Sequence, residues 1–297
     1  MNKIEFGDCR ETMRKWAAQG IKAQTCVTSP PYFGLRDYGH EGQIGLEETP
    51  EQYIAAMVEV FRCVKDVLAD DGTLWVNIGD SYARAGGWSD NHGLSKDANG
   101  VVPARGQSGR AISNFTGDRR SQKVPDGYKQ KDLIGIPWML AFALRTDGWF
   151  LRQEIIWHKP NGAPERMNLG RCAKAHEHVF LLSKESRYHF DGAAIAAQSQ
   201  DGTAKARGSV WSVPVRTYKG AHFATFPPAL IEPCILAGSR PGDIVLDPFM
   251  GSGTTAAVAI QHGRQYLGCE LNSEYGPLQD ERIKLAIPET DKQMSLL

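Results

Sequence analysis

Short apolar segments alternate with helix-like segments at both ends of the chain. Near the N-terminus we expect strands at residues 3–7 and 24–28, with a short helix at 10–18 between them. Apolar residues then recur at intervals of three and four over residues 49–68, which predicts a longer helix. Strands that alternate with helices predict an α/β fold, in which a parallel sheet is covered by helices on both faces.

The rest of the chain continues this pattern. Asp70-Asp71-Gly72 is expected to end the long helix before a buried strand at 73–78. Further strands are expected at 150–158, 178–183, 244–246 and 266–270, and further helices at 132–146, 228–237, 254–262 and 273–286. We find no internal repeat, and residues 1–297 are expected to form a single domain.

Composition excludes several classes of protein. The 34 basic and 34 acidic residues cancel, which argues against a histone-like coat of nucleic acid but allows a local basic patch. No segment approaches the ~18 apolar residues of a membrane span, and the N-terminus lacks the order of a signal peptide. The six cysteines are widely spread without a Cys-x-x-Cys pair, so we expect reduced thiols, a cytoplasmic location and no metal site.

Residues 84–131 break the regular pattern. This glycine-rich interval has nine basic and four acidic residues, a net charge of +5. A long basic segment of this kind indicates either a contact with the phosphates of DNA or a solvated insert. The candidate DNA-binding residues are Arg105, Arg110, Arg119, Arg120 and Lys123, together with Arg36, which could instead pair with Asp37.

The strongest local motif is Asp247-Pro248-Phe249-Met250-Gly251-Ser252-Gly253-Thr254-Thr255, between a predicted strand and an apolar helix. Its glycines allow a ligand to approach the backbone closely, and the start of the helix offers free N–H groups to an anion. The next strand ends at Glu270, which can accept hydrogen bonds from ribose hydroxyls. The unit therefore predicts an adenosine-containing ligand.

The same residues narrow the choice of ligand. A dinucleotide site favours a third glycine where this chain has Ala256, and the Gly-Lys-Ser/Thr of a phosphate-binding P-loop is absent. S-adenosylmethionine is the common adenosine ligand that remains.

A second motif, Thr28-Ser29-Pro30-Pro31-Tyr32, follows a predicted strand. Two prolines stiffen the chain and hold neighbouring carbonyls as acceptors. An exocyclic amino group could donate to the Ser29 hydroxyl and the Pro30 carbonyl, while Tyr32 offers a face on which an extruded base can stack. We therefore predict Ser29, Pro30, Pro31 and Tyr32 as catalytic residues.

Together, the two motifs resemble those of the amino-group DNA methyltransferases, which methylate adenine N6 or cytosine N4. The order, with the Ser-Pro-Pro-Tyr motif first, resembles the circularly permuted beta-type members of that family. The resemblance implies a Rossmann-like methyltransferase sheet, S-adenosylmethionine as cofactor, double-stranded DNA as substrate, a homodimer and, where restriction is involved, a nuclease on a separate chain.

The resemblance also assigns cofactor contacts. Gly7-Asp8 resembles the motif whose Asp contacts the adenine, and residues 222–227 resemble the segment that closes over the methionine end. The full set of expected cofactor-binding residues is Asp8, Thr28, Thr225, Phe226, Asp247, Phe249, Gly251, Ser252, Gly253, Thr254 and Glu270. Because strand 3–7 would lie beside strand 266–270, Asp8 and Glu270 are expected at neighbouring strand ends.

Other candidates carry weaker signals. Cys234 falls in an apolar helical pattern, so we expect it in the core rather than as a nucleophile. His176 and His178 flank Glu177 and are expected to form hydrogen bonds at the entry to a strand rather than to bind a metal. Residues 157–160 (Trp-His-Lys-Pro) either line the active site or form an ordinary polar strand end.

Two alternative functions stay open at this point. A similar Asn-Pro-Pro-Tyr motif occurs in enzymes that methylate a protein glutamine, and a protein of this fold could bind DNA without turnover. Ser29, the permuted order and the basic insert disfavour the first, and the intact motifs disfavour the second. Within the resemblance, Ser29 favours cytosine slightly over adenine.

Overall fold

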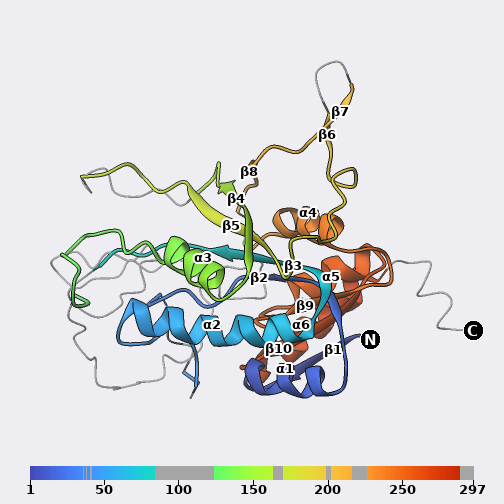
Figure 1. The fold of residues 1–297 in the computed structure, drawn as a ribbon, viewed down its shortest axis with the longest axis horizontal. Coiled ribbons are helices and arrows are strands. Elements are labelled where there is room, and N and C mark those ends of the chain that lie inside the picture. The colour runs from blue at the N-terminus through green and yellow to red at the C-terminus, as the bar shows by residue number, and fades with distance from the viewer. Residues whose placement is uncertain are drawn as a thin grey trace, which may run out of the picture.

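The computed structural model describes residues 1–35, 37, 39–40, 42–83, 124–162, 170–198, 202–215 and 226–287. Its centre is an eight-stranded sheet with the order β1-β10-β9-β2-β3-β5-β4-β8 (Figure 1). Strand β1 (Lys3–Phe6) pairs in parallel with β10 (Gln265–Glu270), so the first strand of the chain lies beside one of the last. This pairing confirms the predicted neighbouring of the two chain ends.

Most of the predicted strands and helices are present near their expected bounds, whereas β3 starts earlier than expected and β6, β7 and β8 were not predicted. The other strands of the large sheet are β2 (Ala23–Thr28), β3 (Leu68–Ile78), β4 (Phe150–His158), β5 (His176–Ser183), β8 (Val210–Ser212) and β9 (Ile244–Asp247). The helices are α1 (Cys9–Ala18), α2 (Pro50–Val67), α3 (Ile136–Thr146), α4 (Pro228–Gly238), α5 (Thr254–Gln261) and α6 (Gly276–Ala286), with a 3-10 turn at Ser273–Tyr275. A small hairpin, β6 (Ala197–Gln198) with β7 (Ala204–Lys205), projects from the body (Figure 1).

The sheet is only partly parallel, which corrects the expectation of a parallel sheet. Strands β1, β10, β9, β2 and β3 pair in parallel, but β5 runs antiparallel to both β3 and β4. Strands β4 and β5 are consecutive and adjacent, so they can pair as a hairpin, for which the antiparallel direction is the natural one. An apolar run in the sequence carries no information about strand direction.

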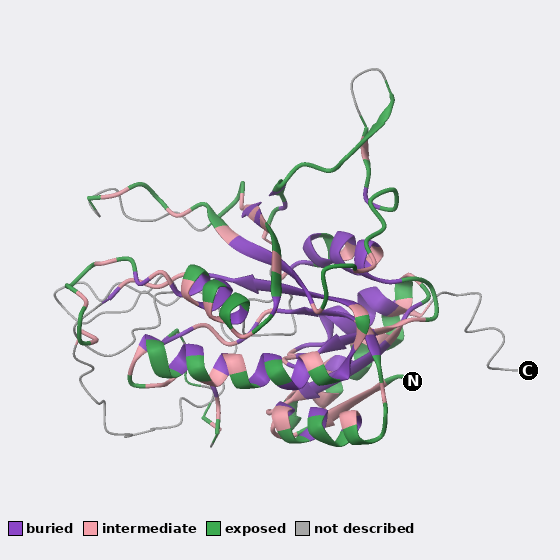
Figure 2. Cartoon of the chain, in the orientation of Figure 1, coloured by how far each residue is buried: buried purple, intermediate pink, exposed green. Residues whose placement is uncertain are grey.

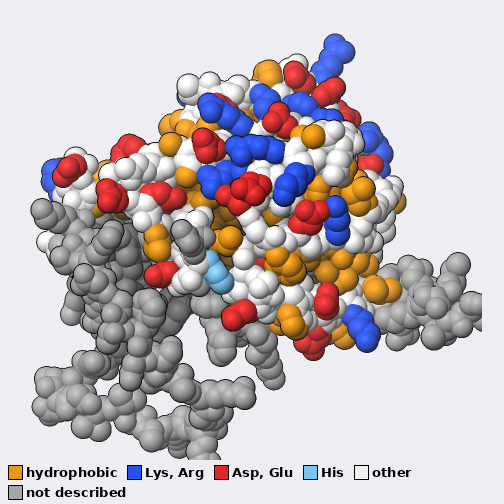
Figure 3. Space-filling view, turned by 90° about the horizontal axis from the view of Figure 1, so that it is seen from below, with side chains coloured by type: hydrophobic (Ala, Val, Ile, Leu, Met, Phe, Trp, Pro, Cys, Tyr) orange, Lys and Arg blue, Asp and Glu red, His pale blue; other side chains and the backbone are white. Residues whose placement is uncertain are grey.

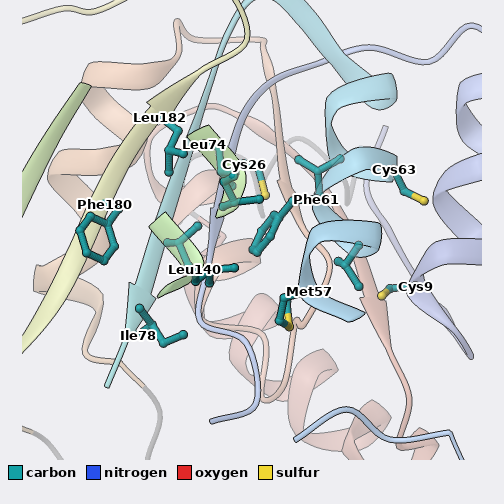
Figure 4. Close-up of a cluster of buried hydrophobic side chains, with 14 of the residues drawn as sticks. Cys9, Cys26, Met57, Phe61, Cys63, Leu74, Ile78, Leu140, Phe180 and Leu182 are labelled. Atoms are coloured by element: carbon teal, nitrogen blue, oxygen red, sulfur yellow. The ribbon is translucent and has the colours of Figure 1, made fainter. Parts of the chain in front are cut away.

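Helices cover both faces of the sheet, as predicted. One buried cluster lies under α1, α2 and α3 and includes Met57, Phe61 and Leu140 (Figure 4). A second cluster lies under α4 and α5 and includes Leu230 and Val258. The inner strands β2, β3, β5, β9 and β10 are largely buried, while the helices turn exposed faces outward (Figure 2).

The junction between α2 and β3 differs from the prediction. Helix α2 begins with a capping box between Thr49 and Gln52, but β3 starts directly after the helix at Leu68. Asp70-Asp71-Gly72 lies inside β3, where the register against β2 shifts between Ala23 and Thr25. The polar residues therefore form an irregularity within a strand instead of a turn before it.

Candidate active site

A cavity of about 420 Å³ opens at the carboxyl ends of the parallel strands. It is lined both by the loop after β2, from Ser29 to Tyr32, and by the glycine turn after β9, from Pro248 to Ser252. The two predicted motifs, more than 200 residues apart in the chain, thus share one cavity.

Most of the predicted site residues that the structure describes line this cavity. They are Asp8, Ser29, Pro30, Pro31, Tyr32, Phe226, Phe249, Gly251, Ser252, Thr254 and Glu270. Thr28, Asp247 and Gly253 lie behind the lining. Thr225 and the candidate DNA contacts Arg36, Arg105, Arg110, Arg119, Arg120 and Lys123 lie outside the described residues.

Asp247 joins the two motifs from behind. It is 1% exposed, and its carboxylate accepts hydrogen bonds from the hydroxyls of Thr28 and Thr255, each at 2.6 Å. The backbone N–H of Phe249 donates to the same carboxylate at 3.0 Å. Burial raises the pKa of Asp247 to about 6, although these donors act in the opposite direction. The end of β2, the end of β9 and the start of α5 are therefore held by one buried acid.

The glycine turn is braced by α6, a contact that the sequence did not indicate. Gly253 has a φ of 82°, which favours glycine, and a side chain there would lie 3.3 Å from the Gln279 backbone. The Gln279 amide donates to the Gly251 carbonyl at 2.7 Å, and Arg282 donates to the Ser252 and Thr254 hydroxyls. Helix α6 thus fixes the shape of the turn.

Two carboxylates stand at the neighbouring ends of β1 and β10, as predicted. Glu270 accepts from the backbone N–H groups of Gly251, at 2.7 Å, and Asn272, at 2.9 Å. Burial raises the pKa of Glu270. Asp8 caps α1 and pairs with Arg10, at 2.6 Å, and the hydrogen bond from Arg10 holds the pKa of Asp8 below its usual value.

The loop after β2 is anchored at both of its last two residues. The Pro31 carbonyl accepts a hydrogen bond from the Tyr53 hydroxyl at 2.8 Å. The Tyr32 hydroxyl donates to Glu177 at 2.7 Å and to the Asn77 side chain at 3.3 Å. Burial raises the pKa of Tyr32 far above its usual value, the charge of Glu177 raises it further, and a side-chain hydrogen bond with Ser29 acts against both.

The far wall of the cavity includes Glu177 and Asn77, which sequence reasoning had not placed in the active site. Glu177 forms an ion pair with Lys159, whose ammonium group lies 4.2 Å from the centre of the Trp157 ring. All three line the cavity with Asn77. Of the two interpretations of residues 157–160, lining the cavity is correct for Trp157 and Lys159, whereas His158 and Pro160 are not part of the lining. Glu177 comes at the start of β5, beside the end of β3, and only the strand pairing shows that it faces Tyr32.

The lining fits the chemistry of the expected cofactor. Glu270 and Asp8 can accept from hydroxyl and amino groups, and Phe226 and Phe249 offer apolar surface to a flat ring. Helix α5 begins at Thr254, and its N-cap residue Gly253 provides no side-chain cap, so the N–H groups of its first turn can bind a carboxylate. Adenosine and amino-acid groups at the two ends of one ligand match these donors and acceptors.

The remaining observations concern metal-binding groups, cysteines, helix lengths and surface charge in the described residues. Within the described ranges, no group of three or more His, Cys, Asp or Glu side chains is arranged to hold a metal ion. All six cysteines are free, and Cys234 is buried in the core as predicted. None of the helices in the described part of the chain is long and apolar enough to cross a membrane. On the face shown in Figure 3, basic and acidic side chains are intermixed.

Comparison with known proteins assigns the chain to a family. The family model described as DNA methylase, for N6 and N4 methyltransferases, matches residues 23–279. The chain is 47% identical to the Type II methyltransferase M.SmaI of Serratia marcescens over 95% of this chain and 90% of that protein. It is 45% identical to the Type II methyltransferase M.Cfr9I of Citrobacter freundii, over 94% of this chain and 86% of that protein.

Solved structures agree on the fold. The putative DNA modification methylase TTHA0409 of Thermus thermophilus, complexed with S-adenosylmethionine, matches 97% of this chain and 95% of its own with a TM-score of 0.61 and 23% identity. The cytosine-N4-specific PvuII DNA methyltransferase matches 95% of this chain and 86% of its own with a TM-score of 0.65 and 19% identity. Both the resemblance in the motifs and the predicted Rossmann-like methyltransferase sheet are thereby confirmed. The chain belongs to the N6/N4 family of DNA methylases.

Proposed function

We propose that this DNA methylase transfers a methyl group from S-adenosylmethionine to the exocyclic amino group of a flipped base, at a specific site in duplex DNA. One observation carries the proposal: the Ser29–Tyr32 loop lines the same cavity as Gly251, Ser252 and Thr254 of the glycine turn. A cofactor on the turn and a base at the loop would meet there without any rearrangement of the sheet.

The glycine-turn half of the cavity is the proposed cofactor site. Glu270 and Asp8 would hold the ribose and adenine ends, and the start of α5 with Thr254 would hold the amino-acid end. When bound, S-adenosylmethionine supplies an electrophilic methyl group. Asp247, from behind the lining, would keep the turn and the Ser29 loop at a fixed separation.

The loop half of the cavity is the proposed base site. The Ser29 hydroxyl and the Pro30 carbonyl would accept the two hydrogens of the amino group, which directs the nitrogen lone pair toward the cofactor side. The Tyr32 ring would stack on the base and repay part of the cost of its extrusion, a few kcal/mol. Orientation of the two reactants is then the main contribution of the protein to the rate.

We infer cytosine N4 as the target atom. In the family that the chain resembles, Ser rather than Asp or Asn at the first motif position favours cytosine. The Ser29 hydroxyl is able to accept a hydrogen bond from the amino group of either cytosine or adenine. Identification of the methylated base therefore tests this assignment. Duplex DNA from cells that express the protein would be sequenced by a method that distinguishes N4-methylcytosine from N6-methyladenine. N6-methyladenine at the modified site would overturn the cytosine assignment.

We also propose a DNA contact, an oligomeric state and a possible partner for this methylase. The basic interval 84–131 is proposed to contact the DNA phosphates. A homodimer is expected from the family resemblance. A restriction nuclease, where one acts with this methylase, would be a separate chain, in keeping with the Type II names of M.SmaI and M.Cfr9I.

A methyl-transfer assay with two substrates separates the alternative functions. Purified protein would be given radiolabelled S-adenosylmethionine with duplex DNA or with a protein extract. We expect label in DNA alone. Label in protein alone would favour glutamine methylation, and tight DNA binding without label in either substrate would favour a DNA-binding regulator.

A further inference from the structure

The side chain of Tyr32 lies between the end of β3 and the start of β5, in a narrow space formed by Asn77, Gly79 and Glu177. Its hydroxyl donates to Glu177 at 2.7 Å, and the Asn77 amide donates to the same Glu177 oxygen at 3.3 Å and to the His178 carbonyl at 3.2 Å. Two polar side chains from two different strands thus converge on one phenol. This arrangement fixes where the tip of the Tyr32 ring lies.

Gly79, just after the end of β3, packs against the ring of Tyr32. A Cβ added there would lie 2.6 Å from Cε2 of Tyr32 and 3.3 Å from the carboxyl carbon of Glu177. Non-bonded carbon atoms do not approach to 2.6 Å, so any side chain at position 79 would displace the Tyr32 ring. Gly79 is not among the glycines with a positive φ, so close approach is the reason that the structure gives for glycine here.

Lys159 balances the charge of this arrangement. Its ammonium group pairs with the second oxygen of Glu177, and the side chains of Lys159 and Glu177 are 19% and 14% exposed. Lys159 offsets the negative charge of the Glu177 carboxylate. The hydrogen bond from the Tyr32 hydroxyl to this carboxylate then orients the phenol. The contacts with Glu177, Asn77 and Gly79 therefore hold the Tyr32 ring in one orientation inside the cavity.

We propose that Glu177 and Gly79 are positioning residues that fix the Tyr32 ring as the stacking surface for the target base. The inference rests on the proposed function, because it requires a base in the loop half of the cavity. Neither residue needs to contact the base. Glu177 acts through the hydroxyl of Tyr32, and Gly79 acts by leaving room for its ring.

The test is a double-mutant cycle on methyl transfer to duplex DNA. Because a misplaced ring loses part of its stacking on the base, Glu177→Gln and Tyr32→Phe are each expected to lower kcat by about tenfold. If Glu177 acts through the hydroxyl, the double variant loses no more than either single variant. S-adenosylmethionine affinity, measured by calorimetry, is expected to stay at the wild-type value in all three.

Gly79→Ala provides a second test that leaves both polar partners in place. It is expected to lower kcat more than Glu177→Gln does, again with unchanged cofactor affinity. Gly208→Ala is the matched control, because a Cβ at Gly208 would meet nothing within 4 Å. Glu232→Gln is the control for Glu177, since Glu232 also has a partner, His262, on a different part of the surface.

The outcomes distinguish a failure of the proposed function from a failure of the positioning role alone. A wild-type protein that methylates no DNA would overturn the proposed function and this inference with it. If the wild type is active but the kcat losses of Glu177→Gln and Tyr32→Phe multiply in the double variant, only the proposed positioning role of Glu177 and Gly79 is overturned. A Gly79→Ala variant with wild-type kcat would also overturn this role. Thermal unfolding of each variant identifies a loss of activity that comes merely from a loss of fold.

Discussion

The Thr28 hydroxyl donates a 2.6 Å hydrogen bond to the Asp247 carboxylate, 219 positions away in the chain. Thr28 is the last residue of β2 and Asp247 is the last residue of β9, two adjacent parallel strands. The Ser29 loop starts directly after the first strand, and the glycine turn starts directly after the second. The bond therefore sets the distance between the proposed base site and the proposed cofactor site.

Loss of this hydroxyl is expected to destabilise the protein. Thr28→Val keeps the shape of the side chain but removes one donor to a buried carboxylate, which costs ~1–3 kcal/mol. Urea unfolding monitored by circular dichroism would measure the change, and Thr28→Ser is expected to restore most of the stability. An unfolding free energy equal to that of wild type in Thr28→Val would show that the bond contributes nothing.

The raised pKa of Asp247 predicts a pH dependence of stability. Since burial raises the pKa from 3.8 to about 6, the folded state binds the proton more tightly than the unfolded state. Stability from this group is therefore highest when the acid is protonated, and it falls as pH rises toward and through the folded value. From about pH 5 to about pH 7.5, the wild type is expected to lose about 1 kcal/mol relative to Asp247→Asn.

The comparison with Asp247→Asn removes the contribution of other titrating groups. Both proteins carry the same remaining acids and histidines, so only the difference between their unfolding free energies is interpreted. A difference that stays constant with pH, or that changes in favour of the wild type as pH rises, would contradict the assignment of a raised pKa to Asp247.

Sequence alone predicted the parts of this site that local motifs encode. The Asp247–Thr255 turn and the Ser29–Tyr32 loop have distinctive residues at fixed spacing, and alternation of strands and helices places both at the same edge of a sheet. The neighbouring of Asp8 and Glu270 followed from the permuted strand order. In each case the chemistry lies within a few consecutive residues or at a predictable strand end.

The parts that sequence did not predict depend on strand direction and packing. Glu177 faces Tyr32 only because β5 is antiparallel to β3, and an apolar run does not reveal its direction. Gln279 braces the glycine turn from a helix whose amphipathic pattern is weak, with Gln279 and Ala286 as its buried residues. Neither side chain belongs to a local motif.

Ser29→Ala is expected to separate catalysis from cofactor binding. The change removes one acceptor for the amino group, and the loss of one such catalytic hydrogen bond typically lowers kcat by about 100-fold or more. Calorimetry is expected to give wild-type affinity for S-adenosylmethionine, because the proposed cofactor contacts lie in the other half of the cavity. Ser209→Ala, at an exposed position, is the control. Loss of cofactor affinity in Ser29→Ala would contradict this division of the cavity.

Gln279→Met is expected to show the opposite pattern. Methionine fills a similar volume beside Gly253 but cannot donate to the Gly251 carbonyl, so the turn loses a brace without losing its packing. A cost of about 1.4 kcal/mol to the correctly shaped turn would weaken S-adenosylmethionine binding about tenfold. At saturating cofactor, kcat is expected to stay close to the wild-type value, because the Ser29 loop is untouched. Glu281→Ala, at an exposed position of the same helix, is the control. A Gln279→Met variant with normal cofactor affinity and reduced kcat would show that α6 acts on the base side of the cavity instead.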